Sequence, residues 1–382
     1  MTAPGPRRAN GALVCVVGAR PNFMKMAPIL RALATQAPGM TRLLVHTGQH
    51  YDSAMSGRFF SDLGLPQPDI DLGVGSGSHA LQTAEIMQRF EPLLDAHPAA
   101  GVLVVGDVNS TLACALVACK KNIPVFHVEA GLRSGDRAMP EEINRLLTDR
   151  IASRLYTTER EAGDNLLKEG VAAEAICFAG NVMIDSLHHA LKKAIPAAET
   201  LAAAGLPTCL PEAPAGYGLL TLHRPSNVDD PRTLGSLLET MASVSTLLPL
   251  VFVAHPRTHN NIEKFGLHAL VRHPGIAMLP PQGYFEMLGL MAGARVVLTD
   301  SGGMQEETTA LGVPCLTLRD NTERPITVSQ GTNRVVGNNG EIILSAVRDI
   351  LAGQGKKGHI PELWDGHAAE RIVSDLMQWL HS

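Results

Sequence analysis

Residues 102–113 read VLVVGDVNSTLA, a stretch that contains a strand, a turn and the start of a helix. Four large apolar residues at 102–105 run directly into Gly106 and Asp107, and an apolar helix is predicted from Ser110. A short, continuous apolar run that ends at a glycine is typical of a strand buried on both faces of a sheet. A strand that passes through a tight turn into a helix predicts a βαβ unit, and therefore a parallel sheet.

This alternation of short apolar runs and longer amphipathic stretches extends in both directions along the chain. Further strands of the first series are predicted at 12–17, 43–46, 125–128, 155–157 and 176–179. Helices are predicted at 22–34, 52–63 and 81–94, and from Pro140, where proline suits the first helical turn. A second series of strands is predicted at 218–222, 250–254, 276–279, 296–299, 315–318 and 334–336. We therefore expect an α/β protein with two Rossmann-like domains, whose parallel sheets face each other across a cleft.

A cluster of prolines among small residues separates the two series. Prolines at 196, 207, 211 and 214 predict a linker at 191–216, between an N-terminal domain at 10–190 and a C-terminal domain at 217–365. The segment QGKKG at 354–358 is a second break, after which a last helix is expected within 366–382. This helix is expected to pack back on the N-terminal domain.

Composition excludes several classes of protein. Hydrophobic residues make up 45% of the 382 residues and charged residues 18%, which rules out disorder for most of the chain. A net charge of -5 argues against nucleic-acid or anionic-membrane partners, because both need a basic face. The apolar runs are far shorter than the roughly 18–20 residues of a membrane helix, and the polar start of the chain does not resemble a signal peptide. Six irregularly spaced cysteines fit free thiols in a reducing cytoplasm.

Several predicted strands end in charged residues that a core would not accommodate. In the first domain these are Asp107, Glu129 and either Glu141 or Glu142, and in the second domain the strand at 218–222 runs into His223. Each has an ordinary structural explanation: Asp107 could cap a helix, a glutamate could favour the helix N-terminus, and His223 could be a core histidine. Their coincidence at strand ends instead predicts a site in the cleft, where clustered carboxylates can hold an acid and a base at one pH.

The segment Ser301-Gly302-Gly303 joins a predicted strand to a helix. Two glycines allow backbone N–H groups to approach a ligand closely, and a helix N-terminus favours anions, so a diphosphate is the expected guest. The alternative is a plain tight turn.

Residues around this turn favour a nucleotide over a bare phosphate. Glu306 and Glu307 follow within the helix, where a carboxylate can accept hydrogen bonds from two ribose hydroxyls. Cationic partners for a diphosphate leaving group are available after other strands, at Arg20, Lys25, Arg319 and Arg324. The first βα turn lacks the G-x-G-x-x-G pattern, so a nicotinamide dinucleotide is not expected there.

Eight segments together resemble the non-hydrolysing UDP-N-acetylglucosamine 2-epimerases, a family with the GT-B fold. They are GARPNFMKMAPI (18–29), HTGQHYD (46–52), GDVNSTLA (106–113), HVEAGLRSGDRAMPEEINR (127–145), GNVMIDSL (180–187), TLHRPSN (221–227), TDSGGMQEE (299–307) and RDNTERP (319–325). The resemblance implies interconversion of UDP-GlcNAc and UDP-ManNAc: UDP leaves by anti elimination, a 2-acetamidoglucal stays bound, and UDP adds again after protonation of the other face of C2. It implies no redox cofactor and no metal, and it suggests a homodimer.

The resemblance also implies roles for individual residues. The catalytic carboxylates fall on Asp107, Glu129 and Glu141, and a cleft histidine falls on His223. The residues implied to bind the UDP-sugar are Ser301, Gly302 and Gly303 at the diphosphate, Glu307 at the ribose, Arg20 and His255 elsewhere on the nucleotide, and the backbone from Gln282 to Met287 at the uracil. Bacterial members often carry a second UDP-GlcNAc as an activator near the segment matching Gln49 and His50, which makes these two residues allosteric candidates. Tyr51 and Asp52 follow them here in place of the usual polar pair.

Four other activities remain open on these residues. They are a hydrolysing 2-epimerase that releases ManNAc, an epimerase of a related UDP-diacetamido sugar, a GT-B glycosyltransferase, and a nucleotide-sugar sensor without catalysis. The three carboxylates of the first domain favour an epimerase over a glycosyltransferase, because no acceptor platform is evident.

Overall fold

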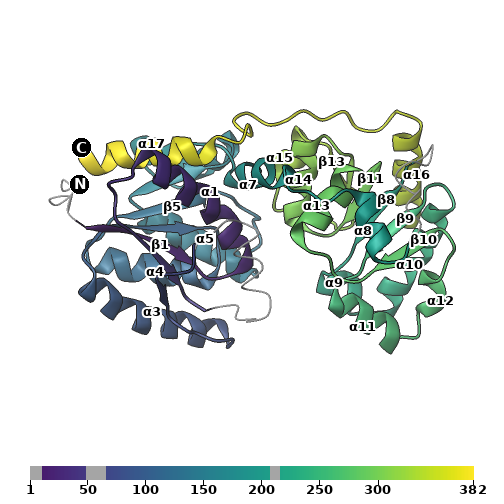
Figure 1. Ribbon diagram of the computed structural model, residues 1–382, viewed down its shortest axis with the longest axis horizontal. Coiled ribbons are helices and arrows are strands. Elements are labelled where there is room, and N and C mark those ends of the chain that lie inside the picture. Colours follow the sequence, from purple (N-terminus) through teal and green to yellow (C-terminus); the bar gives the residue numbers. More distant parts are fainter. Residues whose placement is uncertain (1–10, 49–65, 207–215) are drawn as a thin grey trace. The chain divides into compact units, whose positions relative to one another are not determined.

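The computed structural model describes residues 11–48, 66–206 and 216–382, which form two compact units. Unit 1 comprises Met1–Ser186 and Glu362–Ser382, and unit 2 comprises Leu187–Pro361 (Figure 1). The division falls within helix α7 (Val182–Leu191). The predicted helix at 52–63 and the allosteric candidates Gln49 and His50 lie outside the described residues.

Unit 1 is built on a seven-stranded sheet in the order β3-β2-β1-β4-β5-β6-β7, and every pairing is parallel. Its strands are β1 (Ala12–Val17), β2 (Arg42–His46), β3 (Ile70–Asp71), β4 (Ala99–Val105), β5 (Val125–Ala130), β6 (Arg154–Thr157) and β7 (Ile176–Phe178). All residues of β4 and β5 are buried, as the continuous apolar run predicts. The two-residue strand β3 is too short to leave a pattern in the sequence.

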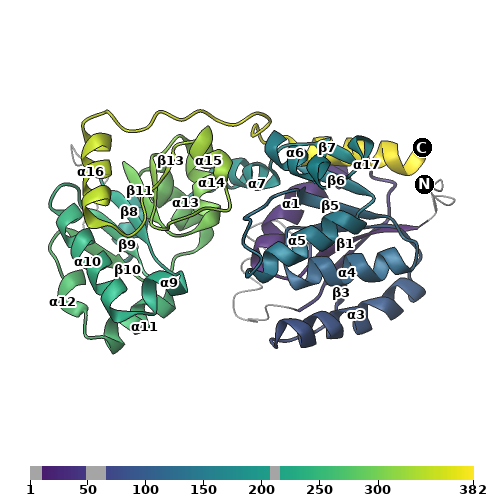
Figure 2. The same cartoon turned by 180° about the vertical axis from the view of Figure 1, so that it is seen from behind.

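Helices cover both faces of this sheet. They are α1 (Arg20–Gln36), α3 (His79–Ala96), α4 (Asn109–Lys120), α5 (Pro140–Ile151), α6 (Arg160–Lys168) and α17 (Ala368–His381). Helices α3, α4 and α5 lie side by side on one face, and α17 lies beside α1 on the other (Figures 1 and 2). The last helix of the chain is thus part of unit 1, where the Trp364 indole donates to the carbonyl of Thr158 and Trp379 packs edge-on against Phe126.

Unit 2 repeats the architecture with six parallel strands in the order β10-β9-β8-β11-β12-β13. Its strands are β8 (Gly218–Thr221), β9 (Leu250–Val253), β10 (Ile276–Leu279), β11 (Val296–Thr299), β12 (Cys315–Thr317) and β13 (Asn333–Val335). Its helices are α8 (Ala197–Ala203), α9 (Pro225–Val228), α10 (Pro231–Ser245), α11 (Pro256–Lys264), α12 (His268–Val271), α13 (Tyr284–Ala292), α14 (Gly302–Leu311), α15 (Pro325–Ser329) and α16 (Gly340–Leu351). The prediction of two Rossmann-like parallel sheets is confirmed, and α8 lies within the segment expected to be a linker.

The strand order reverses at the equivalent position in both sheets. The order reverses between β1 and β4 in unit 1 and between β8 and β11 in unit 2. Ligands of open α/β sheets bind outside the carboxyl ends of the strands at such a reversal. The turns that follow these four strands carry Arg20, Asp107, His223 and Ser301. No helix of the described residues combines the length and the apolar character needed to cross a lipid bilayer.

Candidate active site

Glu129 occupies a strained position at the end of β5. Its side chain is buried, its φ is 68°, and the pairing of β5 with β6 is irregular between Val128 and Ala130. Left-handed backbone is unfavourable for a residue with a side chain, and strain of this kind clusters at functional sites. Lys25 of α1 forms an ion pair with Glu129, and both side chains are more than nine-tenths buried. A cation this close favours the charged form of a carboxylate, whereas burial alone disfavours it.

Asp107 is oriented by helix α5. Its carboxylate lies 2.5 Å from the guanidinium of Arg145, and its carbonyl accepts from the Asn144 amide at 2.9 Å. The N-cap of α4 is Val108, and no side chain caps that helix, so the explanation of Asp107 as a helix cap is wrong. Asp107 is instead a partly exposed carboxylate fixed in place from the neighbouring helix.

The two adjacent glutamates at the start of α5 have different surroundings. Glu142 is buried, accepts the N–H groups of Ser134 and Gly135 at 3.0 and 3.1 Å, and lies 2.6 Å from Arg145. Burial alone would raise the pKa of Glu142, but these hydrogen bonds and the guanidinium outweigh it and lower the pKa. Glu141 is half-buried, and its side chain has no hydrogen bond or ion pair to any residue that the structure describes. Glu142 therefore holds the loop in place, and Glu141 is available for a substrate.

Contacts within unit 1 bring these carboxylate segments together. A Cβ on Gly106, which precedes Asp107, would lie 2.8 Å from the ammonium of Lys25, the partner of Glu129. Arg145 links Asp107 to the first turn of α5, which carries Glu141. We call Asp107, Glu129 and Glu141 the carboxylate cluster. The side chain of Arg20, at the start of α1, lies outside the described part of the structure.

In unit 2, His223 follows β8 and is oriented by Asp300, which follows β11. The ring Nδ1 lies 2.8 Å from Asp300 Oδ1, and the same carboxylate accepts the backbone N–H groups of His223 and Arg224. Asp300 is fully buried; burial alone would raise its pKa, but His223 and these N–H groups lower it. Because Asp300 is ionised, Nδ1 of His223 carries the proton it donates, which leaves Nε2 on the half-exposed side of the ring.

His255 lies beside His223, with ring centroids 5.9 Å apart. Its Nδ1 accepts the N–H of Arg257 and so caps α11, which leaves Nε2 as a donor. Partial burial lowers the pKa of His255, and the neighbouring His223 and Arg257 add to this effect. A neutral His255 can therefore donate one hydrogen bond to an anionic ligand.

The turn Ser301-Gly302-Gly303 begins helix α14, and we refer to it as the glycine turn. Ser301 is the N-cap and makes no side-chain capping bond. A Cβ at Gly302 would lie 2.4 Å from Glu323 Oε1, whereas a Cβ at Gly303 would meet nothing within 4 Å. The space above Gly303 is thus open at a helix N-terminus, which suits an anion.

The two adjacent carboxylates within α14 bind different partners. Glu307 is buried and accepts from the Tyr284 hydroxyl at 3.0 Å, while Glu306 lies 3.4 Å from the Arg324 guanidinium. Gln282 precedes α13 and donates to the carbonyl of Pro280, and Met287 lies within α13. Unit 2 therefore contains all of the predicted nucleotide-binding residues except Arg20 and Lys25, which belong to unit 1.

Two residues that orient candidate site residues were not predicted from the sequence. Arg145 and Asp300 lie inside the quoted segments EEINR and TDSGG, and both orient a predicted site residue. Arg145 has no signal beyond its charge beside a candidate residue, and Asp300 also follows a predicted strand, but their partners are 38 and 77 positions away and the sequence does not reveal them.

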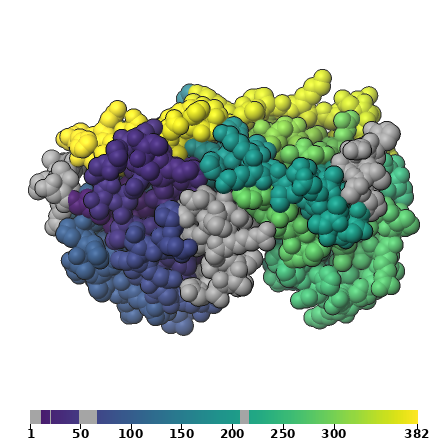
Figure 3. Space-filling model, viewed as in Figure 1, coloured from purple at the N-terminus to yellow at the C-terminus, as the bar shows by residue number. Residues whose placement is uncertain are grey.

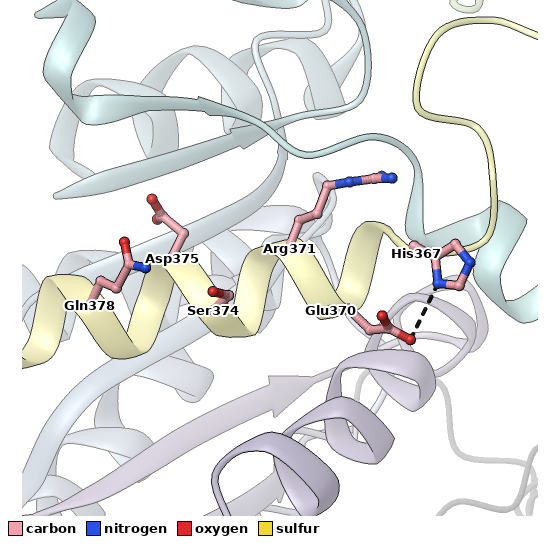
Figure 4. A pocket seen from close by; sticks show the side chains of 6 residues that line it. All are labelled: His367, Glu370, Arg371, Ser374, Asp375 and Gln378. Carbon is pink, nitrogen blue, oxygen red and sulfur yellow. Dashed lines mark ion pairs between the residues drawn. The ribbon is translucent and has the colours of Figure 1, made fainter.

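A surface depression elsewhere has no part in this site (Figure 4). It is lined by His367, Glu370, Arg371, Ser374, Asp375 and Gln378. All six side chains come from α17 and its N-cap, so the depression has no wall from a second element. Its polar groups include the ion pair of His367 with Glu370 at 3.3 Å.

Comparisons with known proteins agree with this geometry. Residues 32–377 match the model of the family described as UDP-N-acetylglucosamine 2-epimerase. The UDP-N-acetylglucosamine 2-epimerase of Methanocaldococcus jannaschii is 41% identical, over 94% of this chain and 97% of that protein. The UDP-2,3-diacetamido-2,3-dideoxy-D-glucuronate 2-epimerase of Pseudomonas aeruginosa is 40% identical, over 89% of this chain and 92% of that protein.

A solved structure is similar over the same length. The crystal structure of the M. jannaschii UDP-GlcNAc 2-epimerase in complex with UDP-GlcNAc and UDP has a TM-score of 0.82 and 40% identity, and it covers 96% of this chain and 99% of that one. The prediction of a GT-B-like α/β fold is confirmed. Because both the family match and these relatives extend over most of its length, this chain belongs to the UDP-N-acetylglucosamine 2-epimerase family.

Proposed function

We propose that this protein is a non-hydrolysing UDP-N-acetylglucosamine 2-epimerase, an isomerase that interconverts UDP-GlcNAc and UDP-ManNAc. The most direct support is that each unit carries a group of candidate site residues after its parallel strands, at the equivalent position in the two sheets. The carboxylate cluster follows the parallel strands of unit 1, and the His223–Asp300 pair and the glycine turn follow those of unit 2. In this proposal both groups act on one nucleotide sugar.

Unit 2 supplies most of the contacts to UDP. The N–H groups of the glycine turn and the Arg324 guanidinium meet the diphosphate. Glu307, held by the Tyr284 hydroxyl, accepts from the ribose hydroxyls, and the backbone from Gln282 to Met287 meets the uracil. His255 donates from Nε2, and Arg20 and Lys25 of unit 1 complete the cationic surroundings.

Unit 1 supplies the proton chemistry. A carboxylate of the cluster removes the C2 proton, the C1–O bond breaks, and UDP leaves as a 2-acetamidoglucal forms. A second carboxylate, in its acid form, returns a proton to the opposite face of C2, and the UDP oxygen re-forms the bond to C1. The C2 proton is weakly acidic, so the base must be close and shielded from water, as the buried Glu129 is. His223, oriented by Asp300, stabilises the charge that develops on departing UDP.

Incubation of the protein with UDP-GlcNAc in D₂O, followed by proton NMR, tests this proposal. We expect deuterium at C2 and the appearance of UDP-ManNAc. Free ManNAc together with UDP would instead identify a hydrolysing enzyme. Tight binding of UDP-GlcNAc without exchange at C2 would identify a sensor, and turnover that requires an added acceptor would identify a glycosyltransferase.

A second substrate has support from the comparisons. The Pseudomonas aeruginosa relative is nearly as similar to this chain as the Methanocaldococcus one, and its name specifies a diacetamido uronate. Both substrates undergo inversion at C2, so the same carboxylates serve either. Parallel assays with both UDP-sugars decide between them, and the substrate with the higher kcat/KM is the natural one.

The protein is further proposed to act in the cytoplasm as a homodimer. Light scattering on the purified chain is expected to give about twice the 40.6 kDa of one copy.

A further inference from the structure

Two side chains of the segment HVEAGLR at 127–133, other than that of Glu129, converge on a single buried carboxylate. His127 Nδ1 lies 2.7 Å from Asp149 Oδ1, and Arg133 Nη2 lies 2.8 Å from Asp149 Oδ2. His127 has no exposed surface, and Asp149 is 2% exposed. Neither residue has a place in the proton chemistry or the UDP contacts described above, although Asp149 belongs to α5, the helix that carries Glu141.

The second nitrogen of His127 binds the turn that carries Asp107. His127 Nε2 lies 2.8 Å from the carbonyl oxygen of Gly106. The N–H of Gly106 donates to the carbonyl of Val128 at 3.0 Å, so β5 binds both backbone polar groups of Gly106. Gly106 has a φ of 67°, a left-handed conformation that glycine adopts readily and a residue with a Cβ does not.

Asp149 binds the turn that follows Glu129. Its Oδ2 accepts the N–H of Gly131 at 3.0 Å, and Gly131 also has a positive φ, 79°. The His127–Asp149 pair therefore connects two left-handed glycines, one directly before Asp107 and one two residues after Glu129. Through its place on α5, Asp149 adds the helix of Glu141 to the same network.

Hydrogen-bond chemistry assigns the charges in this network. The Gly106 carbonyl can only accept, so His127 Nε2 carries a proton. Asp149 also accepts from Gly131 and Arg133; burial alone would raise its pKa, but His127 and Arg133 lower it, so it is a carboxylate to which His127 Nδ1 donates. Arg133 also binds Glu169 through two bonds of 2.8 and 2.7 Å, so this guanidinium joins two carboxylates. The buried Asp149 is thereby paired, which matters because an unpaired buried charge is costly.

We propose that the His127–Asp149 pair is a positioning device, which fixes the distance and direction between the catalytic carboxylates of unit 1. This inference rests on the proposed function, since it assigns the pair a role in the epimerase step. His127 and Asp149 act through the turns of Gly106 and Gly131 and do not touch the substrate. A displacement of about 1 Å in such a site can cost about 100-fold in rate, so the pair should control kcat more than substrate affinity.

Two substitutions of His127 separate its two bonds. The amide of His127→Asn lies near the place of Nδ1 and keeps the bond to Asp149, whereas the longer His127→Gln reaches the place of Nε2 and keeps the bond to Gly106. We expect His127→Asn to lower kcat about 10- to 100-fold, with KM and the Kd for UDP within about 2-fold of wild type. His127→Gln should recover part of that loss. If both variants lose the same factor in kcat and the same amount of Tm, His127 contributes only to packing.

Asp149→Asn and Asp375→Asn form a matched pair of substitutions in unit 1. Each removes the charge of an aspartate that binds an arginine, but Asp375 binds Arg154 at the amino end of β6, away from both turns. Asp149→Asn should lower kcat at least about 10-fold, and Asp375→Asn should leave kcat unchanged. If His127→Asn does not fold, this pair and His127→Gln still decide the question. Equal kcat values in the two Asp variants would overturn the proposal.

Hydrogen exchange gives a readout that does not depend on activity. In Asp149→Asn the amide of Gly131, and in His127→Asn the peptide around Gly106, should exchange faster than in wild type, with no change in Asp375→Asn. Unchanged exchange at both glycines would contradict the positioning role even in an active enzyme. If the wild-type protein does not exchange the C2 hydrogen of UDP-GlcNAc, the proposed function is wrong. The amide hydrogen exchange of the protein still shows whether the pair restrains the two turns.

Discussion

At the residue scale, Glu141 and Glu142 show that neighbours in sequence can differ completely in role. Pro140 starts helix α5, so the two glutamates occupy its first turn and their side chains diverge. Glu142 turns inward to two backbone N–H groups and Arg145. Glu141 stays half-buried, with no such partner among the described residues. The sequence leaves both open as candidates, and the family resemblance selects Glu141.

Substitution of a residue in the carboxylate cluster should remove most of the catalytic activity and leave the affinity for the nucleotide unchanged. We expect Glu141→Gln, and likewise Asp107→Asn and Glu129→Gln, to lower kcat by about 10²–10⁴-fold if each moves a proton, while the Kd for UDP stays near the wild-type value. Steady-state kinetics and calorimetric titration with UDP measure the two quantities. A variant that turns over at the wild-type rate removes its residue from the mechanism.

Glu142→Gln is the matched control for Glu141→Gln, and its effect should be on stability. Loss of charged hydrogen bonds is expected to cost about 1–3 kcal/mol of unfolding free energy. Because folding lowers the pKa of Glu142 below its ordinary value of 4.5, its contribution is complete above about pH 4.5 and is lost as the pH falls through the lowered pKa. Urea unfolding should thus show a difference between wild type and Glu142→Gln at pH 7 that shrinks in acid. A difference that grows in acid would contradict this account.

The partners of the site residues mark the limit of prediction from sequence. Asp107, Glu129 and His223 stand out because they are polar residues at the ends of apolar runs. Arg145 does not stand out, because a charge on a helix is usual, and Asp300 follows an apolar run as well but nothing in the sequence marks it as a partner of His223. Only the fold shows that each faces a site residue far away in sequence. The left-handed conformation of Glu129 is equally hidden, since it arises from the irregular pairing of β5 with β6.

At the scale of elements, strands such as β4, β5, β9 and β11 are the easiest to predict because all of their residues are buried. A continuous apolar run needs no knowledge of its neighbours to be recognised. Short elements such as β3 and α9 lack this signal and were missed. Helix α1 begins at Arg20, two residues before the predicted start, because Pro21 is suited to the first turn.

The start of helix α14 provides a test of the proposed diphosphate site. A methyl group at Gly303 would enter open space, so Gly303→Ala should not lower Tm, but it should weaken UDP binding about 10-fold by narrowing the approach to the N–H groups. Gly302→Ala would instead press on Glu323, which Arg319 holds at 2.7 Å, and should lower Tm. Thermal melts and calorimetric titration with UDP distinguish the two effects. Unchanged UDP affinity in Gly303→Ala would exclude this turn as the diphosphate site.

At the scale of the whole molecule, the end of the chain belongs to unit 1. Helix α17 lies beside α1, as the adjacent purple and yellow surfaces in Figure 3 show, and it buries Ile372, Val373 and Leu376. The carboxylate of Asp185 accepts the N–H groups of Ala368 and Ala369 and so fixes the start of the helix. Both tryptophans of the chain, Trp364 and Trp379, lie in this returning segment. Tryptophan fluorescence therefore reports on unit 1, whereas UDP binding should report on unit 2.

These two signals should separate the stabilities of the two units. Leu376→Ala removes a fully buried side chain from α17 and should lower the stability of unit 1 by about 2–5 kcal/mol. We expect the urea midpoint by tryptophan fluorescence to fall, with little change in the urea concentration that abolishes UDP binding. Leu237→Ala, a matched substitution in a core cluster composed of unit 2 residues, should have the opposite pattern. If both substitutions shift both midpoints equally, the two units unfold as one cooperative body.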